Sequence, residues 1–114
     1  MVVDDEEVFR AVGRSLVEAT PEFTLVGEAD SGEGALERIA ELSPDLVLMD
    51  YRMGPIDGIA ATRAIVERHP GTAVVVMSAE GLDESMLCGC GALAFVRKQD
   101  LSPRRLRQLW ADRP

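Results

Sequence analysis

Apolar runs alternate along the whole chain with segments in which apolar residues recur every three or four positions. The apolar runs are typical of strands that are buried on both faces of a parallel sheet. The segments between them have the spacing of amphipathic helices. The predicted strands cover residues 1–3, 23–29, 46–49, 72–77 and 93–96, and the apolar positions of the predicted helices lie within 8–17, 35–42, 59–66, 86–87 and 106–110.

Capping residues support most of these helices. Asp30 or Ser31 precedes the second predicted helix and Asp57 precedes the third, where a side-chain oxygen can accept a hydrogen bond from the first turn. Ser102 is predicted to cap the last helix, with Pro103 as its first residue. The fourth helix, starting at residue 83 or 85, is expected to be short, because glycines follow it at positions 89 and 91.

Five strands that alternate with five helices predict a doubly wound α/β fold with a parallel sheet covered on both faces. Right-handed crossovers then place the carboxyl end of every strand at one edge of the sheet. Open sheets of this kind bind their ligands at that edge. We therefore predict one domain, residues 1–114, with its functional site at the carboxyl ends of the strands.

Asp50 is the candidate reactive residue. It ends the apolar run 46–49 and precedes a turn rich in glycine and proline. An unpaired charge is costly inside a core, whereas a strand end leaves a carboxylate open to solvent or to a metal ion. A carboxylate that attacks a phosphoryl donor forms an acyl phosphate, a reaction that depends mainly on charge neutralisation.

Other polar residues follow the neighbouring strands at the same edge. Asp5 and Asp50 could supply oxygen ligands to Mg²⁺, with Asp4 nearby as a second ligand or through water. The Ser78 hydroxyl could donate a hydrogen bond to a phosphoryl oxygen. Lys98 would offset the crowded carboxylates, and it is the only lysine in a chain that has 11 arginines.

The composition is that of an ordinary globular domain, with 46% hydrophobic and 28% charged residues. Residues 1–50 hold 13 acidic and three basic side chains, a balance of −10, which argues against direct nucleic-acid binding. Residues 97–114 hold six basic and two acidic side chains, a balance of +4, either a partner surface or a solvated helix face. No apolar run approaches the roughly 20 residues of a membrane span, and we expect a cytoplasmic protein.

These residues together resemble the receiver domain of two-component response regulators. The resemblance covers essentially the whole chain, and the lysine followed by glutamine instead of proline is similar to receivers that precede LuxR-type helix-turn-helix domains. It is carried by the acidic pair Asp4-Asp5, by Asp50 in a D-x-x-M-[P/G]-x-x-D-G stretch, by Ser78-Ala79, and by Gly91-Ala92 leading to Phe95 and Lys98.

The resemblance implies a flavodoxin-like sheet of strand order 2-1-3-4-5 and phosphotransfer from a phosphohistidine of a sensor histidine kinase to Asp50. It implies that Asp4, Asp5, Asp50 and the backbone carbonyl of Arg52 hold Mg²⁺. It further implies a switch made by Ser78 and Phe95, although Phe95 could equally be a core residue.

The same resemblance implies a partner or an output DNA-binding domain outside this chain, and a possible homodimer. We expect a phosphoacceptor that is not an enzyme and at most slowly loses its own phosphoryl group.

Two other functions are compatible with parts of the pattern. Loss of the candidate site residues would favour a phosphorylation-independent interaction module on the same scaffold. All five are present: Asp4, Asp5, Asp50, Ser78 and Lys98. A phosphatase of the haloacid dehalogenase type needs a second aspartate two residues after the nucleophile, where this chain has Arg52. Two departures from the receiver pattern, the order Gly54-Pro55 and a short interval between Ser78 and Lys98, predict an altered loop and a short fourth helix.

Overall fold

The computed structural model describes residues 1–53, 57–80 and 89–114. The predictions for the Gly54-Pro55 loop and for the fourth helix lie outside these residues. The elements run in the order β1 (Val2–Val3), α1 (Glu7–Glu18), β2 (Glu28–Ala29), α2 (Gly32–Leu42), β3 (Leu46–Asp50), α3 (Gly58–Arg68), β4 (Ala73–Ser78), β5 (Ala94–Arg97), η2 (Lys98–Asp100) and α4 (Pro103–Ala111).

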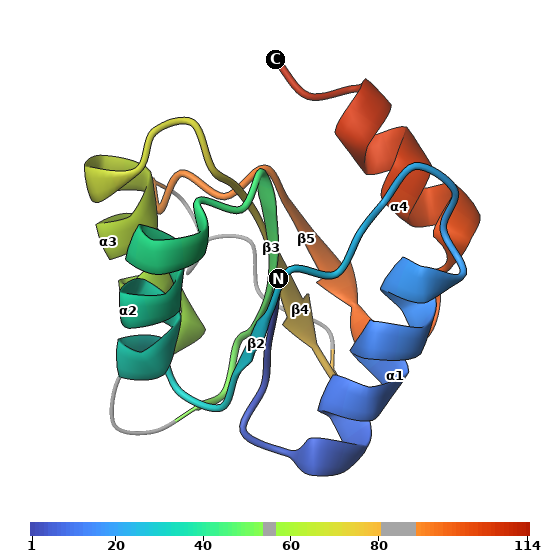
Figure 1. Cartoon of the computed structure of the whole chain (residues 1–114), viewed down its shortest axis with the longest axis horizontal. Helices are drawn as coiled ribbons and strands as arrows, with labels where there is room; N and C mark the ends of the chain where they lie inside the picture. Colours follow the sequence, from blue (N-terminus) through green and yellow to red (C-terminus); the bar gives the residue numbers. More distant parts are fainter. Residues whose placement is uncertain (54–56, 81–88) are drawn as a thin grey trace.

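The five strands form one sheet in the order β2-β1-β3-β4-β5, and every pair of neighbours is parallel. Helices α2 and α3 cover one face of this sheet, and α1 and α4 cover the other (Figure 1). The predicted doubly wound fold and its strand order are therefore confirmed. The chain leaves each strand at the same edge, where the candidate site residues were expected.

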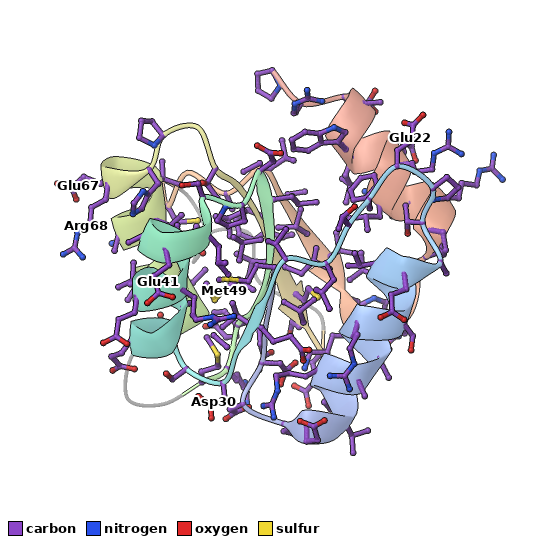
Figure 2. The ribbon with its side chains drawn as sticks, viewed as in Figure 1. Glu22, Asp30, Glu41, Met49, Glu67 and Arg68 are labelled. Carbon is purple, nitrogen blue, oxygen red and sulfur yellow. The ribbon has the colours of Figure 1, made fainter. Side chains whose placement is uncertain are left out.

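The core consists of two apolar layers, one on each face of the sheet. Along β4, Val74 and Val76 belong to the layer beneath α2 and α3, whereas Val75 and Met77 belong to the layer beneath α1 and α4. Met49 of β3, labelled in Figure 2, is fully buried in the first layer. Because successive side chains of a strand point to opposite faces, covering both faces requires an unbroken apolar run.

The predicted helix starts are confirmed by their hydrogen bonds. Ser31, Asp57 and Ser102 are the N-caps of α2, α3 and α4, and the side-chain oxygen of each accepts a hydrogen bond from the backbone N–H three residues later. Pro103 is the first residue of α4. These bonds satisfy backbone donors that have no partner within the helix.

The second strand is shorter than predicted. Residues 23–29 were expected to form it, but only Glu28 and Ala29 do so. They pair with Val2 and Val3, the two residues of β1. A strand exists only where a neighbour offers hydrogen bonds, so the length of β1 limits β2, whatever the apolar content of residues 23–27.

Candidate functional site

Three carboxylates meet at the carboxyl edge of the sheet. One oxygen from each of Asp4, Asp5 and Asp50 lies within 4.8 Å of the other two. Asp4 and Asp50 follow or end the adjacent strands β1 and β3 and are 1% and 5% exposed, whereas Asp5 is open to solvent. The site thus contains two buried carboxylates, Asp4 and Asp50, and one solvent-exposed carboxylate, Asp5.

Lys98 supplies the positive charge at this site. It directly follows β5, and its Nζ lies 2.6 Å from Oδ2 of Asp4 and 3.3 Å from Oδ1 of Asp50. A single ammonium thus bridges the two buried carboxylates. The predicted meeting of Asp4, Asp5, Asp50 and Lys98 is what the structure shows.

Burial controls the charge of Asp50. Desolvation, and then the nearby charge of Asp4, raise the pKa of Asp50 to about 6 from an ordinary 3.8, although Lys98 opposes both effects. For Lys98, desolvation lowers the pKa, but the hydrogen bond to Asp4 and the charge of Asp50 outweigh it, so the pKa is raised. Above neutral pH, Asp50 is therefore a carboxylate facing a charged ammonium.

The backbone around Asp4 is held by groups that the sequence did not single out. The Asp4 Oδ1 atom accepts a hydrogen bond of 3.0 Å from the backbone N–H of Glu6, and Arg10 donates a bond of 2.8 Å to the Asp4 carbonyl. Arg10 also pairs with Glu7 and Glu28. These contacts fix the turn between β1 and α1, which carries Asp4 and Asp5.

The glycine that begins α3 allows this helix to approach Asp50. The N–H of Gly58 donates a 2.9 Å bond to the Tyr51 carbonyl, and a Cβ at position 58 would lie only 2.1 Å from the Asp50 carbonyl oxygen. Any side chain there would displace the backbone of Asp50. Gly58 is the glycine of the D-G step in the sequence motif, and the close approach to Asp50 explains why a glycine is required at this position.

Ser78 lies on β4, the strand next to β3, and Phe95 lies on β5, the edge strand of the sheet. Ser78 is the buried last residue of β4, and its Oγ accepts a 3.2 Å bond from the N–H of Glu80. Phe95 of β5 is half-buried and packs against the core layer beneath α2 and α3. Their switch roles and the role of the Arg52 carbonyl as a metal ligand stay predictions.

Phe9 is a further neighbour of Lys98 that the sequence did not reveal. The predicted spacing of α1 made it one of several apolar positions, but the Lys98 Nζ lies 3.8 Å from the centre of its ring. The one available signal was an aromatic residue one helical turn after the acidic pair. This signal is weak because Phe9 has the same spacing as core residues of the helix.

The donor set of the site fits a hard divalent cation. Three carboxylates offer only oxygen ligands, as Mg²⁺ prefers, and the exposed Asp5 leaves one side open to water or to phosphate oxygens. Such an arrangement favours reactions in which negative charge gathers on phosphoryl oxygens.

Comparisons with known proteins agree with this arrangement. A family model of the response regulator receiver domain matches residues 1–110. The chain is 35% identical over 112 residues to the transcriptional regulatory protein DegU of Brevibacillus brevis, covering 98% of this chain and 44% of DegU.

Two solved structures are similar in fold. The signal receiver domain of the response regulator NarL from Mycobacterium tuberculosis superposes with a TM-score of 0.85 at 31% identity, covering 97% of this chain and 90% of that one. The response regulator domain of Thermotoga maritima CheB gives 0.83 at 28% identity, covering 96% and 91%.

The curated relatives also correct the prediction that the protein is not an enzyme. One relative, in Symbiobacterium thermophilum, is a protein-glutamate methylesterase/protein-glutamine glutaminase, 38% identical over 101 residues that cover 86% of this chain and 28% of the enzyme. The chain spans less than half the length of this relative and of DegU. The match is confined to the receiver domain, and the catalytic domain of the enzyme lies outside it.

Within the described ranges 1–53, 57–80 and 89–114, every helix is too short or too polar to cross a membrane.

Proposed function

Since this chain belongs to the family of response regulator receiver domains, we propose that Asp50 accepts a phosphoryl group from a phosphohistidine of a sensor histidine kinase. One observation carries the choice of residue: the Lys98 ammonium bridges the buried carboxylates of Asp4 and Asp50 beside the exposed Asp5. This arrangement offers a nucleophile and a counter-charge within one site.

The reaction exchanges one bond to phosphorus for another. A carboxylate oxygen of Asp50 attacks the phosphorus atom as the bond from phosphorus to the histidine nitrogen breaks. The bonding pair leaves with the imidazole, and Asp50 becomes an acyl phosphate. Lys98 stays within reach of the phosphoryl oxygens and offsets their charge, since its Nζ already lies 3.3 Å from an oxygen of Asp50.

Mg²⁺ would be held by Asp4, Asp5 and Asp50, with the backbone carbonyl of Arg52 as a further ligand. When bound, the ion supplies charge neutralisation for the phosphoryl oxygens. The support for this proposal is the all-oxygen donor set and the pKa of about 6 for Asp50. This pKa reflects desolvation and then repulsion by Asp4, and the charge of a nearby cation would offset both.

Phosphorylation would then be read through Ser78 and Phe95. The Ser78 hydroxyl would donate to a phosphoryl oxygen, and Phe95 would turn further into the core. One or two charge-assisted hydrogen bonds are enough to invert a two-state population. A DNA-binding output domain outside this chain is supported by the similarity to DegU, a transcriptional regulatory protein. The homodimer and the cytoplasmic location rest on family resemblance and composition.

The alternative, a phosphorylation-independent interaction module, is not favoured. Such a module does not need Asp50, a buried carboxylate whose charged form is disfavoured by burial and by the nearby Asp4. In this chain the carboxylates and the lysine are present and in mutual contact.

Intact-mass measurement after incubation with acetyl phosphate and Mg²⁺ tests the proposal. We expect one phosphoryl group on the wild type and on Asp57→Asn, and none on Asp50→Asn or in the presence of a chelator. Asp57 is the matched control because its carboxylate caps α3 and asparagine caps a helix equally well. Equal phosphorylation of the Asp50→Asn variant would refute the assignment.

A further inference from the structure

The aromatic ring of Phe9 lies against the Lys98 ammonium. The Nζ atom is 3.8 Å from the ring centre, well inside the separation of about 6 Å at which a cation is attracted to an aromatic face. Phe9 is in the first turn of α1, directly after the acidic turn of the site. Helix α1 thus brings an aromatic face to the one lysine of the chain.

Packing alone does not account for this position of Phe9. The ring is half-buried, and among the described residues it belongs to neither of the two apolar layers of the core. Large apolar side chains normally gain stability by joining such a layer. The contact with Lys98 is therefore the distinctive interaction of this ring.

We propose that Phe9 is a positioning residue that holds the Lys98 ammonium in place for phosphoryl transfer to Asp50. The inference rests on the proposed function of Asp50. In this role Phe9 acts through Lys98, whose Nζ lies 3.8 Å from the centre of its ring, and takes no direct part in the transfer.

The uncharged ring performs a task that a third carboxylate could not. Asp4 and Asp50 bind the ammonium through opposite charge, and each thereby offsets part of the charge that the phosphoryl oxygens need. The face of an aromatic ring attracts a cation through its quadrupole and adds no net charge to the site. Phe9 therefore restrains Lys98 and leaves its charge available.

The contact with the ring also does not depend on the chemical state of Asp50. When Asp50 is phosphorylated, the oxygen that now lies 3.3 Å from Nζ changes its charge and its position. The contacts of the ammonium with Asp4 and Phe9 involve neither the phosphorus atom nor the Asp50 oxygens. Lys98 thus keeps its place while its third partner changes from a carboxylate to a phosphoryl group.

A series of fluorinated phenylalanines at position 9 separates this role from simple packing. Each added fluorine weakens the negative face of the ring and changes its shape little. We expect the initial rate of phosphoryl gain from acetyl phosphate, measured by intact mass with Mg²⁺, to fall stepwise with fluorine number. The total fall, and that of Phe9→Leu, should be on the order of three- to thirtyfold.

Val12→Ala is the matched control in this experiment. Val12 is an exposed residue of the same helix. Acetyl phosphate is the phosphoryl donor, so docking of a kinase to α1 cannot affect the rate of the Val12→Ala variant. Its rate should equal that of the wild type. Rates that do not change along the fluorinated series would overturn the proposal.

A double-mutant cycle on urea unfolding provides a second readout that needs no phosphoryl donor. The Phe9→Leu and Lys98→Gln substitutions should be non-additive, because removing either side chain removes the same contact. Additive effects would overturn the contact. If wild-type Asp50 accepts no phosphoryl group, the proposed function and this inference both fail, whereas a phosphorylated wild type with a flat fluorine series refutes the inference alone.

Discussion

Replacing Asp50 with asparagine should stabilise the fold at pH 8, and the gain should disappear as the pH falls to about 4. The pKa of Asp50 is about 6 in the folded chain, against an ordinary 3.8, because burial and the charge of Asp4 disfavour the carboxylate. Between about pH 3.8 and 6, Asp50 binds more protons in the folded state than in the unfolded state. Its contribution to the stability of the fold therefore falls as the pH rises. Asparagine does not titrate, so the variant escapes this loss.

The size of the effect follows from the shift. The difference between 6 and 3.8 is about two pKa units, and each unit corresponds to about 1.36 kcal/mol, so the gain is at most about 3 kcal/mol at pH 8. It should be complete above about pH 7, where Asp50 of the wild type is a carboxylate in both states. Titrating groups that do not interact with Asp50 are common to both proteins and cancel in the difference. Asp4 and Lys98 do interact with Asp50, so the figure of about 3 kcal/mol is an upper value.

Urea unfolding of the two proteins from pH 4 to 8, in a chelator, measures this difference. Trp110 is a suitable fluorescence probe, because its ring packs edge-on against Phe23 at 6.4 Å and the contact is lost on unfolding. Asp57→Asn, at an exposed carboxylate, should show no such pH-dependent gain. A stability difference for Asp50→Asn that does not change with pH, or a loss at pH 8, would refute the argument.

Three further predictions concern the core and the metal site. Gly13→Ala should destabilise the fold by about 1–3 kcal/mol in urea unfolding, since the new methyl group would lie 2.8 Å from Cγ1 of Val2, and a gain in stability would contradict this packing. Leu106→Ala should cost about 2–5 kcal/mol by the same measurement, because Leu106 is fully buried beneath the sheet, and a change below 1 kcal/mol would be inconsistent with that burial. Mg²⁺ should raise the melting temperature of the wild type more than that of Asp5→Ala, and equal increases in a thermal shift assay would argue against a magnesium site at Asp5.

The sequence by itself determined the layout of the fold and the main residues of the site. Unbroken apolar runs predicted buried parallel strands, and the capping residues Ser31, Asp57 and Ser102 marked helix starts. These signals are local, since an apolar run and a capping side chain are both formed by residues close together in the chain. The carboxylates and Lys98 could be placed at one edge because the ends of parallel strands meet there.

Only the tertiary structure decided how the residues of that edge interact. Periodicity assigned Phe9 to a helix face, but its contact with Lys98 depends on how α1 packs beside β5. The ion pair between Lys98 and Asp4 depends on the same packing. The length of β2 depended on β1, and the raised pKa of Asp50 depended on its burial beside Asp4. Distances, burial and charge between segments remote in the chain arise from packing, and a residue pattern carries no measure of them.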